Sequence, residues 1–294
     1  MNDDKQYLYS EEFLKPREFN YSCNNNTVLS FINNNTPFII RNNVNESLCT
    51  KWQNLDYLSN TLGEIQLPIE SYKDSFYDIN TSTIIHLTLK EYMDYLLATQ
   101  SQQNLYLAEL ELYNRGRKAD SVLYPLNSDI VDNDLLYHKT LLYSRVLFLG
   151  KNTISQMHYH RRCEAILNQI LGVKRVFLFP PNNGLFYQMK PYAWYLKKNN
   201  WSKIIYKVKD ALDFKEILKT KKLINGFEIV LNPGDSLYIP IYWWHIVFGE
   251  NISLSYTDFF FADFKKKYLT FLGLRSGNQI AALLKYWKQW IRVK

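Results

Sequence analysis

The stretch Met157–Pro181, MHYHRRCEAILNQILGVKRVFLFPP, contains the strongest structural pattern in this sequence. It opens with two histidines one residue apart, His158 and His160, and continues as a long apolar segment with a turn at residues 172–175. Side chains two residues apart on a β-strand leave the same face, so both imidazoles can reach a common point. The stretch therefore predicts a strand with two metal-binding side chains that leads into a buried sheet.

A second stretch, residues 232–245 (NPGDSLYIPIYWWH), ends in a third histidine, His245. Glu164 lies shortly after the first histidine pair. Two imidazoles, a nearby carboxylate and a distant third imidazole form a ligand set suited to a mid-row transition metal. For the carboxylate an alternative stays open, because Glu164 could equally be an exposed turn residue or pair with Arg161 or Arg162.

The composition indicates a folded, aromatic-rich protein. Hydrophobic residues make up 47% of the 294 residues, which is enough for a sizeable core and excludes a disordered chain. Lys and Arg number 35 against 28 Asp and Glu, a formal net charge of +7. Because these basic residues are dispersed along the chain, the charge alone does not indicate a nucleic-acid partner, although it leaves RNA open.

Targeting signals and cysteine usage bear on the compartment. The N-terminal residues lack the basic-then-apolar pattern of a signal peptide, and no run approaches the roughly 18 apolar residues that span a bilayer. The three cysteines have no paired spacing, which favours reduced thiols. We therefore expect a cytoplasmic or nuclear protein without a transmembrane segment that is not secreted.

Short strands separated by turns dominate the chain from Ser144 onward, which predicts a sandwich or a barrel. We expect a polar, loosely held arm with a short helix or strand at residues 1–36 and a β-domain at 37–262. An insertion at 182–225 is rich in Lys, Tyr and Trp and is expected to shape the mouth of the barrel. Amphipathic C-terminal helices at 263–294 would pack on the domain or on a second copy in a homodimer.

Hydrophobic periodicity and turn residues predict the individual elements. Strands are expected at 37–41, 64–70, 105–112, 145–149, 155–160, 227–231, 236–240 and 252–256, and on either side of Gly172. Helices are expected at 52–63, 88–99 and 132–138, the second of them with Thr88 as its N-cap.

Several short pieces carry a resemblance to a known family, in the family's order. They are Pro37–Arg41, Tyr106-Leu107, Leu149-Gly150, His158-Tyr159, residues 172–181 and residues 234–245. Together they resemble the JmjC/cupin-type 2-oxoglutarate oxygenases, and most of all the small protein hydroxylases that include the asparaginyl hydroxylase of hypoxia-inducible factor. The resemblance implies a mainly β fold with flanking helices, the double-stranded β-helix or jelly roll.

The resemblance also implies a site. In that family Fe(II) is held by a His-x-Asp/Glu pair and a distal His, and a Lys after the glycine turn holds the far carboxylate of 2-oxoglutarate. By this resemblance, His158 and His245 of this chain are expected to be metal ligands, and Lys174 is expected to anchor the cosubstrate. Further hydrogen bonds to 2-oxoglutarate fall on Tyr106 and on Ser155 or Gln156.

The chain departs from that family at the acidic ligand, where it has His160. A gap-free alignment would place Tyr159 and Arg161 in the ligand positions, and neither suits Fe(II). Ordinary cupins instead bind a metal through His-x-His, three or four residues and a Glu, with a distal His. By that pattern the ligands of Fe(II), or of another divalent metal, are His158, His160, Glu164 and His245.

Three functions follow from these alternatives. The first is an Fe(II)/2-oxoglutarate-dependent dioxygenase that hydroxylates a side chain of a protein or peptide, with RNA as the other substrate class. The second is a cupin metalloenzyme that uses three histidines, with or without the glutamate, and no 2-oxoglutarate. The third is a catalytically inactive JmjC fold that binds a partner.

Overall fold

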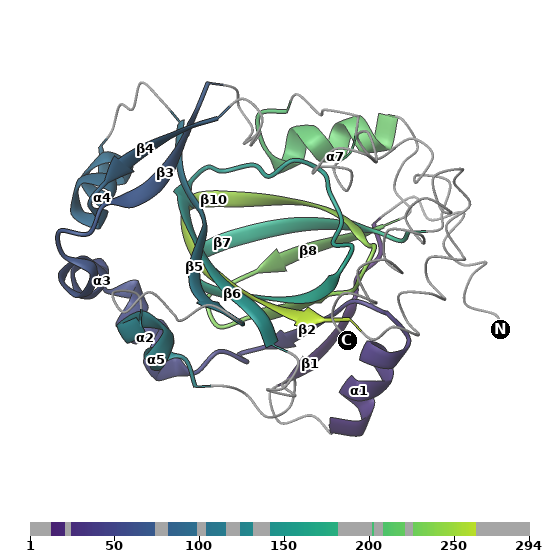
Figure 1. The fold of residues 1–294 in the computed structure, drawn as a ribbon. Coiled ribbons are helices and arrows are strands. Elements are labelled where there is room, and N and C mark those ends of the chain that lie inside the picture. The colour runs from purple at the N-terminus through teal and green to yellow at the C-terminus, as the bar shows by residue number, and fades with distance from the viewer. Residues whose placement is uncertain are drawn as a thin grey trace, which may run out of the picture.

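The computed structural model describes residues 13–20, 25–73, 82–98, 104–115, 124–131, 142–181, 202, 208–220 and 226–262 (Figure 1). The strands are β1 (Arg17–Asn20), β2 (Phe38–Arg41), β3 (Leu67–Tyr72), β4 (Thr83–Leu87), β5 (Asn104–Asn114), β6 (Leu142–Lys151), β7 (Cys163–Phe179), β8 (Phe227–Leu231), β9 (Ser236–Ile239) and β10 (Trp244–Phe261). The helices are α1 (Asn25–Asn33), α2 (Glu46–Gln53), α3 (Leu55–Leu62), α4 (Leu89–Leu97), α5 (Tyr124–Asp129) and α7 (Ala211–Thr220).

All the strands of the described residues belong to one curled sheet. Their order is β1-β2-β9-β7-β10-β6-β5-β3-β4, and β8 pairs with β7 beside this path. The first pair, β1 and β2, is parallel and the others are antiparallel. Figure 1 shows the strands curving around an interior. The mainly β, jelly-roll fold expected from the sequence is confirmed.

The long strands β7 and β10 form the centre of the sheet and support the interior. Over residues 165–168 β7 pairs with β9, and over residues 174–178 it pairs with β8. Along its opposite edge, β7 pairs with β10 from Trp244 to Phe261, with a register shift between Glu250 and Leu254. The paired strands β7 and β10 thus both contribute side chains to the interior, among them Lys174 of β7 and His245 of β10.

Gly172 lies where β7 changes partners. Its φ is +68°, and a Cβ at this position would lie 2.1 Å from the carbonyl oxygen of Ile252. Both the left-handed backbone and the close approach require glycine. The sequence predicted two strands separated by a turn here, and the structure instead has one strand of 17 residues with an irregularity at the glycine.

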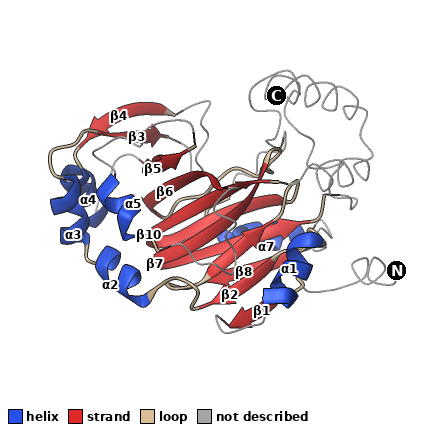
Figure 2. Ribbon diagram, turned by 60° about the horizontal axis from the view of Figure 1, so that its bottom comes forward, coloured by secondary structure: helices blue, strands red, loops and turns tan. Residues whose placement is uncertain are grey.

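Helices α2 to α5 lie together along one side of the sheet, beside β3 to β6 (Figure 2). Their buried side chains, which include Trp52 and Tyr92, pack in one cluster with Leu254 and Tyr256 of β10. This cluster occupies the outer face of the central strands, so the inner face remains for the site. On another side, Phe214 of α7 packs against Phe177 and Phe248 of the sheet, with ring centroids 5.1 and 5.6 Å away.

The structure corrects two of the expected elements. The helix expected at 52–63 is in fact two helices, because Asn54 ends α2 and its side chain accepts hydrogen bonds from the first backbone N–H groups of α3. The strand expected at 155–160 is not regular, since this segment joins β10 only through isolated bridges and backbone hydrogen bonds. The expected helix at 88–99 is present as α4, with Thr88 in a capping box.

The N-terminal part is more closely packed than expected. β1 pairs with β2, and the side chains of Phe19 and Val28 are buried, so residues 17–20 and 25–33 are not loosely held. The domain boundaries themselves stay a prediction. The helices expected at 132–138 and 263–294 lie outside the described residues. Among the residues that the structure does describe, no helix is long and apolar enough to cross a membrane.

Candidate metal centre

A backbone bridge brings His158 and His245 together across the interior. The N–H of His158 donates to the carbonyl of His245 at 3.0 Å, and the N–H of His245 donates to the carbonyl of His158 at 2.8 Å. Two residues further on, the carbonyl of His160 accepts from the N–H of Tyr242 at 2.9 Å. Hydrogen bonds between the segment before β7 and the start of β10 therefore hold all three histidines at one place.

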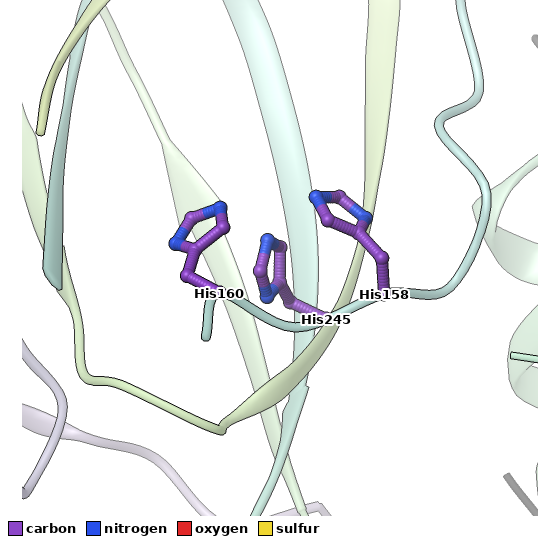
Figure 3. Close-up of side chains that lie close together, drawn as sticks. All are labelled: His158, His160 and His245. Atoms are coloured by element: carbon purple, nitrogen blue, oxygen red, sulfur yellow. The ribbon is translucent and has the colours of Figure 1, made fainter. Parts of the chain in front are cut away.

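The three imidazole rings lie beside one another (Figure 3). The ring centroid of His245 is 4.1 Å from that of His158 and 4.7 Å from that of His160, and the outer two centroids are 5.6 Å apart. One potential ligand nitrogen of each ring lies within 4.8 Å of those of the other two. This is the convergence that a single metal ion requires.

Backbone carbonyls fix the tautomer of two of the rings. Nδ1 of His158 lies 2.7 Å from the carbonyl of Gln156, and Nδ1 of His245 lies 2.9 Å from the carbonyl of Trp243. A carbonyl can only accept a hydrogen bond, so each Nδ1 carries the proton. The lone pair of each neutral ring is then on Nε2, where it is available to a metal.

Burial keeps the three rings neutral. It lowers the pKa of His158 and of His245, and it lowers the pKa of His160 to about 3, with the neighbouring His158 adding to the effect. Nδ1 of His160 is buried without a hydrogen-bond partner within the described residues, and the ring lies edge-on to Phe259 at 5.2 Å. Neutral imidazoles with converging lone pairs fit Fe, Zn, Cu or Ni, so the residues present fit a divalent transition metal.

Glu164, the fourth expected ligand, is not brought into this group. It lies on β7 three residues before Leu167, whose side chain lines the cavity beside the histidines. Because side chains alternate along a strand, Glu164 faces the opposite side of β7. There burial raises the pKa of the Tyr238 hydroxyl, and the adjacent Glu164 carboxylate raises it further.

Lys174 occupies the same cavity as the histidines. Its side chain is 3% exposed, its Nζ donates to Oγ of Ser255, and it lies 5.3 Å from the ring centroid of Phe148. Burial lowers its pKa to about 7. No carboxylate forms an ion pair with it in the described part of the chain. The amine is therefore buried, and no carboxylate of the described residues serves as its counter-ion.

The register of β7 against β10 sets the distance between this lysine and the histidines. Lys174 is paired with Gly249, and Leu178 is paired with His245. Four residues of strand correspond to about 13 Å between the two backbone positions, and both long side chains project into the space between them. The cavity there has a volume of about 100 Å³. It is lined by Tyr106, Ala108, Glu109, Phe148, Ser155, His158, His160, Leu167, Lys174, Ile239, His245, Val247, Thr257 and Phe259.

The other expected cosubstrate residues divide into two groups. Tyr106 and Ser155 line the cavity. Burial raises the pKa of the Tyr106 hydroxyl, which keeps it a neutral donor, and Oγ of Ser155 accepts from the N–H of Val247 at 2.9 Å. Gln156 does not line the cavity, but its carbonyl orients His158.

The gap-free alternative is not favoured by the geometry. Tyr159 packs its ring 4.7 Å from Trp244 and 5.8 Å from Tyr242, in an aromatic cluster away from the three imidazoles. Neither Tyr159 nor Arg161 lines the cavity. Sequence reasoning missed Ser255 and Glu109, because both come from strands with register shifts that no local pattern marks.

A family model and several known proteins match this chain. The family model described as a cupin-like domain matches residues 25–287. The chain is 26% identical over 225 residues to lysine-specific demethylase JMJ30 of Arabidopsis thaliana. This alignment covers 75% of this chain and 48% of that protein. It is 26% identical over 238 residues to JmjC domain-containing protein D of Dictyostelium discoideum, covering 76% of this chain and 50% of the relative.

A shorter match joins 144 residues to tRNA wybutosine-synthesizing protein 4 of Gibberella zeae, at 28% identity, covering 49% of this chain and 13% of that protein. The chain spans about half the length of the first two relatives. The family model, by contrast, extends over most of the chain and over every residue of the three-histidine cavity. The chain therefore belongs to the JmjC-like cupin domain family.

Proposed function

We propose that this protein is a metal-dependent oxygenase that uses Fe(II) and 2-oxoglutarate to hydroxylate a protein side chain. The observation that carries the proposal is the pairing, in one cavity, of three neutral histidines with a buried lysine that has no counter-ion among the described residues. The JmjC names of the relatives support the same class of activity.

Each end of the cavity has its own part in this function. His158, His160 and His245 would hold Fe(II), which supplies the activation of dioxygen when it is bound. Lys174, with Oγ of Ser255 beside it, would take the far carboxylate of 2-oxoglutarate, because a buried cation is stabilised by a paired and hydrogen-bonded anion. Tyr106 would donate a hydrogen bond to the same cosubstrate and Ser155 would help to orient it.

The proposed substrate class rests on the relatives. One relative is named for lysine demethylation and another for tRNA wybutosine synthesis. We favour a protein or peptide, because the match to the first relative covers 75% of this chain and the match to the second covers 49% of it. A homodimer through residues 263–294 and a cytoplasmic or nuclear location stay predictions.

An anaerobic titration tests the proposal. Protein loaded with one equivalent of Fe(II) should develop a weak metal-to-ligand charge-transfer band on addition of 2-oxoglutarate, and aerobic turnover of 2-oxoglutarate should follow. The matched variant Lys174→Met should keep its metal but bind 2-oxoglutarate more than about tenfold more weakly, since a charge-assisted hydrogen bond contributes about 1.5–3 kcal/mol. Metal binding without any band or turnover would reject the use of 2-oxoglutarate.

A second candidate is a three-histidine metalloenzyme that does not use 2-oxoglutarate. It is favoured by the orientation of Glu164, because the group of potential ligands among the described residues then consists of the three histidines alone. The same titration separates the two, because this enzyme would bind metal at one equivalent and respond neither to 2-oxoglutarate nor to Lys174→Met. A protein that takes up no metal after reconstitution would support the third alternative, an inactive binding fold.

A further inference from the structure

Two glycines leave room for one threonine, Thr153, beside the part of the cavity that contains Lys174. A Cβ on Gly150 would lie 2.5 Å from Cγ2 of Thr153 and 2.7 Å from Cδ2 of Tyr106. A Cβ on Gly249 would lie 2.7 Å from Oγ1 of Thr153. Contacts this short essentially never occur at real Cβ atoms, so any larger residue at either position would displace the threonine or the tyrosine ring.

The backbone holds Thr153 in the same row of the sheet as Lys174. The carbonyl of Thr153 accepts from the N–H of Gly249 at 2.7 Å, and Gly249 is paired with Lys174 across β7 and β10. Directly paired residues of antiparallel strands share a face, so the space above Gly249 lies on the inner face with Lys174. Oγ1 of Thr153 occupies that space, and only 4% of this residue is exposed.

The hydroxyl of Thr153 contacts the hydroxyl of Tyr106. The two side chains form a hydrogen bond, and among the described residues Tyr106 lines the cavity whereas Thr153 does not. Burial raises the pKa of the Tyr106 hydroxyl, Tyr72 and Glu109 raise it further, and the hydrogen bond with Thr153 lowers it. A hydroxyl that donates to a phenolic oxygen has this lowering effect, because it stabilises the ionised form.

We propose that Thr153 is a positioning residue for the cosubstrate, whose hydroxyl donates to Oη of Tyr106 and thereby directs the phenolic proton into the cavity. A tyrosine hydroxyl has one proton to donate and can also accept hydrogen bonds. When Thr153 donates to the phenolic oxygen, the proton of Tyr106 is available to a carboxylate seated on Lys174. The inference rests on the proposed function, since that carboxylate belongs to 2-oxoglutarate.

The opposite direction of this hydrogen bond would have the opposite effect. If Tyr106 donated to Thr153, the phenolic proton would be used within the protein, and a carboxylate would meet only lone pairs. Removal of the Thr153 hydroxyl would then release the proton and strengthen the binding of 2-oxoglutarate. The sign of the change in affinity therefore distinguishes a residue that positions Tyr106 from one that competes with the cosubstrate.

A pair of variants that differ by one oxygen atom tests this inference. Thr153→Ser keeps the hydroxyl and Thr153→Ala removes it, and both residues are smaller than threonine, so both fit between the two glycines. Each variant is made alone and together with Tyr106→Phe, loaded anaerobically with Fe(II) and titrated with 2-oxoglutarate through the charge-transfer band. Metal content and thermal unfolding are measured on the same samples. Thr153→Val is a second variant without the hydroxyl, to be used if Thr153→Ala does not fold.

Wild type and Thr153→Ser should bind 2-oxoglutarate equally tightly, and Thr153→Ala should bind it roughly two- to tenfold more weakly, the range for a neutral hydrogen bond. With Tyr106→Phe present, the serine and alanine variants should not differ, because the phenol through which Thr153 acts is absent. Metal content should be the same in all of them.

Equal or tighter binding by Thr153→Ala, or a loss that persists without the phenol, would overturn the inference and leave the proposed function intact. A wild-type protein that binds Fe(II) and shows no charge-transfer band would instead reject the use of 2-oxoglutarate. The role of Thr153 would be rejected with it, because no cosubstrate would then be positioned.

Discussion

The two faces of the β7–β10 strand pair treat charged and polar groups in opposite ways. On the outer face, Asp258 is fully buried, and its Oδ1 accepts from Nε of Arg145 at 2.5 Å. The same guanidinium donates to Asn127 at 3.1 Å. On the inner face, the buried amine of Lys174 forms no ion pair with a carboxylate of the described residues. A buried charge that is matched within the chain supports the fold, and one that is left unmatched indicates a place for a ligand.

The largest expected effect is on the outer face. Asp258→Asn should destabilise the protein by about 3–5 kcal/mol, because it leaves the guanidinium of Arg145 buried without its anion. The free energy of unfolding, measured with urea, checks the size, and metal content should stay at the wild-type level. A loss below about 1 kcal/mol, or a loss of metal with the fold intact, would contradict the division of roles between the two faces.

The next effect concerns the inner face. His245→Ala should weaken metal binding more than about a hundredfold, since even residues that only orient a ligand contribute 10- to 100-fold. Glu164→Gln, on the same strand pair but facing outward, should keep the full metal content. Elemental analysis after reconstitution and dialysis measures both variants. Loss of the metal from Glu164→Gln, together with its retention by His245→Ala, would contradict the assignment of the metal ligands to the inner face.

Local spacing was enough to predict part of the site. The spacing of the histidines predicts His158, His160 and His245, and the family resemblance predicts Lys174; all four line one cavity. Patterns of this kind work where the chemistry depends on residues that a single turn or bridge holds together. The jelly-roll fold followed from the same stretches, because their order along the chain matches the family.

The face of the sheet on which each side chain lies could not be predicted in the same way. The segment between His160 and Cys163 is irregular, so the alternation of side chains begins anew where β7 starts, and Glu164 falls on the outer face. Similarly, Ser255 reaches Lys174 only because the register shifts between Glu250 and Leu254. Irregular backbone decides these positions, and its conformation depends on tertiary contacts that composition and periodicity do not record.

The smallest expected effect concerns the cost of burying Lys174 without an anion. Burial lowers the pKa of this amine to about 7, below its ordinary value of 10.5. In the absence of ligands the folded state therefore binds fewer protons than the unfolded state between these two pH values, and stability rises with pH across that window. Below about pH 7 both states carry the charge, and the destabilisation by the buried ammonium is fully present.

Lys174→Met removes the titrating group and keeps an apolar side chain of similar length. The variant should be more stable than ligand-free wild type near pH 6.5, and its advantage should shrink by on the order of 2 kcal/mol by pH 9, as measured by urea unfolding at each pH. With metal and 2-oxoglutarate present, the carboxylate of 2-oxoglutarate would raise the pKa of Lys174, so the stability of wild type would depend less on pH. The buried charge of the inner face would then be paired, as Asp258 is on the outer face. An advantage that stays constant from pH 6.5 to 9 without ligands would mean that the amine already has an anion inside the fold, and the difference between the two faces would disappear.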